Sequence, residues 1–188
     1  MPKPFIDLRS DTVTKPSTEM LEAMFKAEVG DDVFHEDPTV IALQEKIAKL
    51  FSMEASLFFP SGTMANQVAI KIQTNPGDQV ICDKDAHIFH YESGGVAFNS
   101  GVSCCLINGN NGQFTSEDVK NNINKPEFYH TPFSKLVAIE NTANRAGGTF
   151  WNFTELKAIK AVCNANNLKF HLDGARLWNA LVETDELP

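Results

Sequence analysis

The sequence has no long apolar run, few basic residues and only four cysteines. Among its 188 residues, 16 are Lys or Arg and 24 are Asp or Glu, so the formal net charge is -8. Nucleic-acid binding requires clustered basic side chains, and no such cluster is present, which argues against a nucleic-acid partner. No apolar stretch is long enough to predict a membrane span. The first residues, Met1 to Asp7, contain an early acid and no apolar h-region, so they do not resemble a secretory signal, and we expect a cytoplasmic protein.

The cysteines do not match a metal site or a disulfide framework. Their positions (Cys82, Cys104, Cys105 and Cys163) fit no zinc pattern, and an adjacent pair is a poor basis for disulfides. We therefore expect reduced, mostly buried thiols. A metal site at His35, Glu36 and Asp37 is also not expected, because adjacent loop residues rarely share one ion. No metal is predicted for this protein.

The length of the chain favours one well-packed core. Residues 5–14 alternate loosely and predict an extended arm, followed by a helix from Pro16 to about Val29 and a polar loop over 30–37. Asp37 and Pro38 predict the start of a second helix. Apolar residues repeat along it at helical spacing and predict one buried face: Val40, Leu43, Ile47, Leu50 and Phe51.

From residue 55 onward, short apolar strands alternate with helices. The strands are predicted over 57–59, 79–82, 102–107, 136–139 and 168–172, and the helices over 62–74, 115–122 and 154–166. Thr115 and Asp118 form a near capping box at the start of the second of these helices. This alternation predicts an α/β fold with a mostly parallel sheet and helices on both faces.

The strand over 168–172 leads into Asp173, Gly174 and then Arg176. Ligands of open α/β sheets bind at the carboxyl ends of the strands. An aspartate there could hold a cationic ring nitrogen, and an arginine nearby could hold an oxyanion. The alternative is a helix N-cap aspartate with a surface arginine.

Two other strand ends carry polar residues. Pro60-Ser61-Gly62-Thr63 lies where a predicted strand gives way to a helix, which would offer backbone N–H groups and hydroxyls to a phosphate; ordinary Ser/Thr capping is the alternative. Glu140-Asn141-Thr142 ends another strand and could contact a ligand or form a turn.

His87 follows a predicted strand, and Glu92 lies five residues further on. The histidine could stack on a planar ring or carry a proton, whereas a lone histidine more often has a packing role, and the nearby His90 weakens any single choice.

Taken together, these motifs resemble the low-specificity threonine aldolases, within the β-eliminating lyase group of pyridoxal-phosphate enzymes that have the aspartate-aminotransferase fold (fold type I). The resemblance spans nearly the whole chain, in the family's order. It rests on Asp7–Thr14, Gly30–Val33, Glu36–Thr39, Ser61–Gln67, Asp85–His87, Glu140–Thr142 and His171–Arg176.

The resemblance implies pyridoxal 5'-phosphate as cofactor and cleavage of threonine, or a related β-hydroxy-α-amino acid, to glycine and an aldehyde. It implies that three residues hold the cofactor phosphate: Ser61, Gly62 and Thr63. His87 would stack on the ring and Asp173 would pair with the ring nitrogen. Arg176 would lie near the ring hydroxyl and the substrate carboxylate, which Ser10 would also reach. His87, Asp173 and Arg176 would then carry the catalysis.

Residues 1–188 would comprise an N-terminal arm and most of the cofactor-binding large domain, without the small C-terminal domain. Relatives form dimers or tetramers with shared active sites, and the loop Gly30–Thr39 would contribute to a neighbouring subunit. The family's Schiff-base lysine lies beyond Pro188, so we expect a longer polypeptide to supply it; a chain ending there would be a non-catalytic fragment. Many relatives carry a histidine where this sequence has Ala143. A β-eliminating lyase acting on another amino acid is the alternative function.

Overall fold

The computed structural model describes residues 5–124 and 127–188. The chain divides into two compact units, one ending at Phe58 and one spanning Phe59–Pro188. In the described part of the chain, no helix is long and apolar enough to cross a bilayer.

The first unit contains short helices whose starts are set by side-chain caps. A 3₁₀ helix, η1 (Asp11–Val13), interrupts the predicted extended arm. Helix α1 (Thr18–Lys26) is capped by Ser17, so Pro16 lies just before the helix rather than in its first turn. Helix α2 (Pro38–Leu50) begins as predicted, with Asp37 accepting hydrogen bonds from the backbone N–H groups of Thr39 and Val40.

The predicted burial of α2 is wrong for this chain. None of its residues is buried, and Leu43 is 43% exposed. The helical period of its apolar residues is correct, but burial also requires a covering layer, and the described residues of this unit bury none of α2. The predicted strand over 57–59 is also wrong. The backbone N–H of Phe58 donates to the Gln44 side chain at 2.8 Å instead of to a neighbouring strand.

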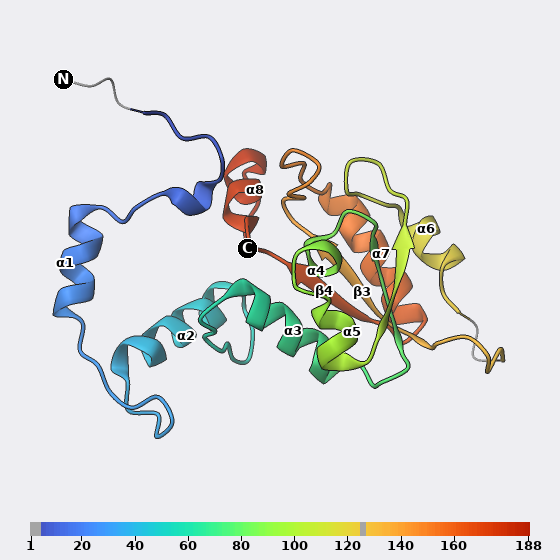
Figure 1. The fold of residues 1–188 in the computed structure, drawn as a ribbon, viewed down its shortest axis with the longest axis horizontal. Helices are drawn as coiled ribbons and strands as arrows, with labels where there is room; N and C mark the ends of the chain where they lie inside the picture. Colours follow the sequence, from blue (N-terminus) through green and yellow to red (C-terminus); the bar gives the residue numbers. More distant parts are fainter. Residues whose placement is uncertain (1–4, 125–126) are drawn as a thin grey trace. The chain divides into compact units, whose positions relative to one another are not determined.

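The second unit is built on a parallel sheet of four strands in the order β2-β1-β3-β4 (Figure 1). The strands are β1 (Gln79–Asp83), β2 (Ser103–Ile107), β3 (Ser134–Glu140) and β4 (Lys169–Asp173). All three pairings are parallel, with Glu140 beside Asp173 at the end of the β3–β4 pair. Because β2 and β3 lie on opposite sides of β1, the strand order reverses next to β1. Ligands of open α/β sheets bind at such a switch point.

Helices cover both faces of this sheet, which confirms the predicted fold class. On one face, Ile81, Val137 and Ile139 pack with residues of α6 (Ser116–Asn121) and α7 (Phe153–Ala165). On the other face, Val80 and Leu136 pack with residues of three helices: α3 (Gly62–Gln73), α4 (His87–His90) and α5 (Gly95–Ser100). Successive residues of a strand point to opposite faces, so consecutive apolar residues fill both cores.

Local signals explain some of these elements and miss others. Thr115 and Asp118 form the expected capping box of α6. Helices α4, α5 and α8 (Leu177–Thr184) have no counterpart among the predicted elements. The first two are only four and six residues long, too short to show a clear helical period.

The cysteines are free thiols, as expected, with two buried and two half-buried.

Candidate active site

The candidate site lies where β1, β3 and β4 end. Strand β1 leads through a short turn to His87, β3 ends at Glu140, and β4 ends at Asp173. The backbone N–H of Asn141 donates to the Asp173 carbonyl at 2.9 Å, which ties the ends of β3 and β4 together. Three polar side chains predicted from separate parts of the sequence therefore meet at one edge of the sheet.

Asp173 is 7% exposed, and both of its carboxylate oxygens have defined partners. Oδ1 accepts the backbone N–H of Ala175 at 3.2 Å, and Oδ2 accepts the Asn66 amide at 2.9 Å. The N-cap of α8 is Arg176, so Asp173 does not cap that helix. A buried carboxylate that accepts hydrogen bonds is suited to hold a cationic group.

His87 is held at two atoms. Its backbone N–H donates to Glu140 Oε2 at 3.0 Å, and its ring Nδ1 lies 3.0 Å from Glu92 Oε1. The Glu92 side chain is fully buried, whereas the His87 side chain is 33% exposed. The imidazole is therefore anchored on one side by a buried carboxylate and keeps part of its surface accessible.

Glu140 organises the backbone around His87. Besides the His87 N–H, it accepts the backbone N–H of Asn144 at 2.9 Å, and its carbonyl accepts the Trp151 indole N–H at 2.9 Å. The pKa of the Glu140 carboxyl is raised, because the effect of burial exceeds that of the two backbone N–H hydrogen bonds, which lower the pKa. The peptide bond from Asn141 to Thr142 is cis.

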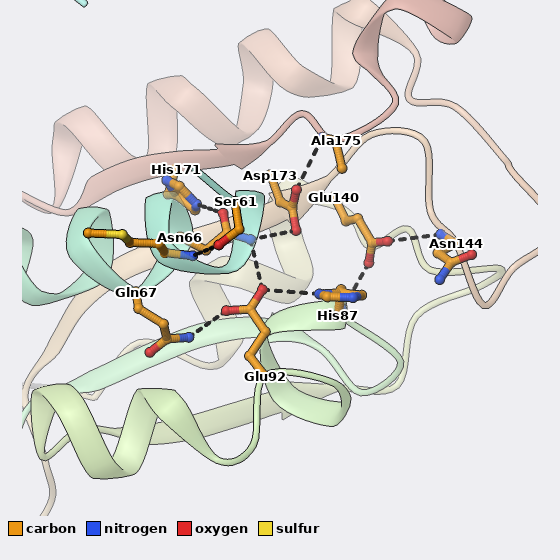
Figure 2. A network of polar contacts seen from close by, with 11 residues as sticks. Ser61, Asn66, Gln67, His87, Glu92, Glu140, Asn144, His171, Asp173 and Ala175 are labelled. Atoms are coloured by element: carbon orange, nitrogen blue, oxygen red, sulfur yellow. Dashed lines mark hydrogen bonds and ion pairs between the residues drawn. The ribbon is translucent and has the colours of Figure 1, made fainter. Parts of the chain in front are cut away.

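Asn66 connects these groups (Figure 2). Its amide nitrogen donates to Glu92 Oε1 and to Asp173 Oδ2, each at 2.9 Å. Its oxygen lies 2.9 Å from Nε2 of His171, a residue whose pKa is lowered by burial. One side-chain atom from each of three residues lies within 4.8 Å of the other two: a ring nitrogen of His87 and a carboxylate oxygen of both Glu92 and Asp173. The Asn66 amide hydrogens bridge the two carboxylates.

The predicted phosphate-binding residues open helix α3. Ser61 is the N-cap, and its Oγ accepts the backbone N–H of Met64 at 3.1 Å, which is the ordinary capping bond. Ser61 and Thr63 also line a cavity of about 480 Å³, together with Lys71 and Asn99. The first N–H groups of a helix lack intrahelical partners and favour an anion. The structure therefore shows ordinary capping by Ser61 beside an open cavity, and phosphate binding there stays a prediction.

The remaining predicted residues lie elsewhere. Arg176 is half-buried and lines a cavity of about 680 Å³ with Thr142 and Trp178. Ser10 belongs to the first unit, where its Oγ accepts the Thr12 N–H at 3.2 Å, so its part in the site stays a prediction. Ala143 is 3% exposed, and a methyl group cannot exchange a proton.

Sequence reasoning did not select Asn66, Gln67 or His171 as site residues, although signals for them exist. Asn66 and Gln67 share the buried side of α3 with Ile70, and buried polar residues in a helix are uncommon. His171 is two residues before Asp173 on β4, so the two side chains point to the same face.

The chain is similar to known proteins over most of its length. The sequence model of the β-eliminating lyase family matches residues 7–188. The chain is 42% identical over 178 residues to the low specificity L-threonine aldolase of Escherichia coli, covering 94% of this chain and 52% of that protein. It is 38% identical over 181 residues to the enzyme of the same name from Saccharomyces cerevisiae, covering 95% and 46%.

Among solved structures, the threonine aldolase of Leishmania major superposes with a TM-score of 0.72 at 27% identity, covering 87% of this chain and 46% of that one. The chain thus spans about half the length of the curated relatives it matches. This structural likeness confirms the expected fold type I architecture. With the family model matching nearly every residue and the polar strand ends assembled as its motifs imply, the chain belongs to the β-eliminating lyase family.

Proposed function

We propose that this protein is a pyridoxal-phosphate-dependent lyase that cleaves threonine, or a related β-hydroxy-α-amino acid, to glycine and an aldehyde. The observation that carries the proposal is the buried Asp173 carboxylate at the carboxyl end of β4, linked to His87 through Asn66 and Glu92. The names of the relatives from Escherichia coli and Saccharomyces cerevisiae support the substrate.

The donor set fits the proposed cofactor. Ser61, Gly62 and Thr63 would hold the phosphate with the hydroxyls and N–H groups at the start of α3, a helix of twelve residues. Asp173 would accept a hydrogen bond from the protonated ring nitrogen of the cofactor. Because the Asp173 carboxylate is buried, the resulting ion pair would be stronger than at the protein surface. When bound, the cofactor supplies an electron-accepting ring for the pair released from the Cα–Cβ bond.

The chain's own residues would orient the substrate and move its proton. Arg176 would bind the substrate carboxylate, a pairing that suits its planar guanidinium, with Ser10 as a second contact. His87 would cover the ring and take the proton of the substrate hydroxyl, directly or through water. The side chain of Ala143 cannot take this proton, so His87 is the candidate base among the predicted site residues.

The test is product analysis on the holoenzyme. With threonine as substrate, glycine and acetaldehyde should form in equal amounts and only in the presence of pyridoxal phosphate. The second candidate, β-elimination from another amino acid, is favoured by the description of the matching family model. Pyruvate and ammonia from such a substrate, without glycine from threonine, would replace the first proposal with the second.

We further propose a homo-oligomer in which the loop Gly30–Thr39 reaches a neighbouring subunit's site. Apolar side chains exposed in the first unit support an interface there, including Leu8 and Phe25, each 91% exposed. A strictly monomeric protein with full activity would contradict this proposal. The four free thiols support a reducing compartment, which we propose to be the cytoplasm.

A further inference from the structure

Glu92 is a buried carboxylate to which the proposed function assigns no role. It is 3% exposed, accepts hydrogen bonds from the side-chain amides of Gln67 and Asn66, and lies with Oε1 3.0 Å from Nδ1 of His87. The amide nitrogens of Asn66 and Gln67 can only donate, so Glu92 acts here as an acceptor on both oxygens. The hydrogen of the contact with His87 therefore resides on the imidazole Nδ1.

The orientation of Asn66 makes this arrangement specific. Its amide nitrogen gives one hydrogen to Glu92 and one to Asp173, and its oxygen receives Nε2–H from His171. Rotating the amide by half a turn would place its oxygen against two carboxylates. His171 thus fixes the one orientation in which both carboxylates receive donors.

Glu92 is held from a second side as well. Gln67 donates to its other oxygen, and the amide of Gln67 packs where Gly95 has no side chain. A Cβ added at Gly95 would lie 2.5 Å from the Gln67 amide carbon. The close approach of α5 to α3 at this glycine therefore leaves room for the Gln67 amide to bind Glu92.

We propose that Glu92 is a positioning residue that fixes the His87 imidazole with its hydrogen on Nδ1, so that Nε2 is the nitrogen that accepts a proton during turnover. This inference rests on the proposed function, in which His87 adjoins the ring and the substrate. Glu92 would act only through His87, as the buried carboxylate does for the histidine of a Ser-His-Asp triad.

The test compares Glu92→Gln with Glu117→Gln in the holoenzyme. Glu117 lies on α6, where its carboxylate is exposed and pairs with Lys120 at 3.1 Å. We expect Glu92→Gln to lower kcat for threonine by at least about tenfold, with the loss of about 10⁴-fold for the orienting carboxylate of a Ser-His-Asp triad as the upper bound, while KM changes little. Glu117→Gln should leave both constants unchanged, and Glu92→Asp should restore part of kcat.

Nitrogen NMR of ¹⁵N-histidine-labelled protein gives a readout that does not depend on activity. At a pH at which the imidazole is neutral, the His87 signals, assigned with His87→Gln, should show hydrogen on Nδ1 and none on Nε2, and Glu92→Gln should abolish this preference. Hydrogen on Nε2 and none on Nδ1 in the unaltered protein would overturn the inference, even if Glu92→Gln fails to fold. An unchanged kcat and unchanged spectrum in Glu92→Gln would overturn it too. Absence of glycine formation by the unaltered enzyme would instead refute the proposed function.

Discussion

Replacing Asn66 by alanine should destabilise the protein strongly, although alanine is the better helix former. Asn66 is 6% exposed and makes two hydrogen bonds of 2.9 Å to carboxylates, those of Glu92 and Asp173. Hydrogen bonds to charged groups contribute about 1.5–3 kcal/mol each, so losing both costs about 3–6 kcal/mol. The higher helix propensity of alanine returns only about 0.5 kcal/mol. Water entering the vacated space will partly solvate the carboxylates, so we expect a net loss of about 3 kcal/mol.

The matched control is Asn164→Ala. Asn164 lies on α7, is exposed, and should become slightly more favourable for the helix when replaced by alanine. The two variants therefore make the same chemical change with opposite expected signs. Urea unfolding at neutral pH would give the difference in free energy of unfolding from the transition midpoints, provided the slope m is unchanged. A loss below about 1 kcal/mol in Asn66→Ala would refute the argument, because a single ordinary hydrogen bond contributes that much.

Three further predictions concern single residues. Asp173→Ala should nearly abolish turnover while some pyridoxal phosphate still binds, and near-normal kcat in that variant would exclude the proposed role. Burial lowers the pKa of His171, so the unfolded state takes up the proton first as the pH falls below 6.5. The free energy of unfolding should therefore decline below pH 6.5, by at most about 1.4 kcal/mol per pH unit, and His171→Gln should flatten that decline in urea titrations. Gly112→Ala should destabilise more than Gly77→Ala: both glycines have positive φ, but only at Gly112 would the new Cβ meet the Ala143 methyl, at 2.7 Å. Equal midpoints for the two glycine variants would show that the Ala143 contact relaxes freely.

Much of the second unit follows from local sequence. Alternation between short apolar strands and helices predicts the parallel sheet, since strands buried on both faces are apolar throughout. In both units, helix starts could be predicted from caps: those of α6 at Thr115 and of α2 at Asp37 each depend on an interaction between residues two or three positions apart. Asp173 and His87 could be placed at strand ends for the same local reason.

Burial and pairing could not be predicted in this way, because they depend on a second surface. The period of α2 correctly indicates an apolar stripe, but none of the residues of α2 is buried. Residues 57–59 have the composition of a strand, but in the described part of the chain no strand pairs with them. An apolar pattern predicts which side chains of a segment can be buried, but it does not predict which other segment packs over them.

By itself, the sequence determined the family, the α/β class and the residues at the strand ends, because each is encoded within a few neighbouring positions. Only the tertiary structure decided that Asn66 lies between Glu92 and Asp173, which are 26 and 107 positions further along the chain. It also decided that His171 orients that amide across 105 positions. Hydrogen bonds between such distant residues exist only once the sheet has brought β4 beside β3 and α3 against its face, so no local pattern predicts them.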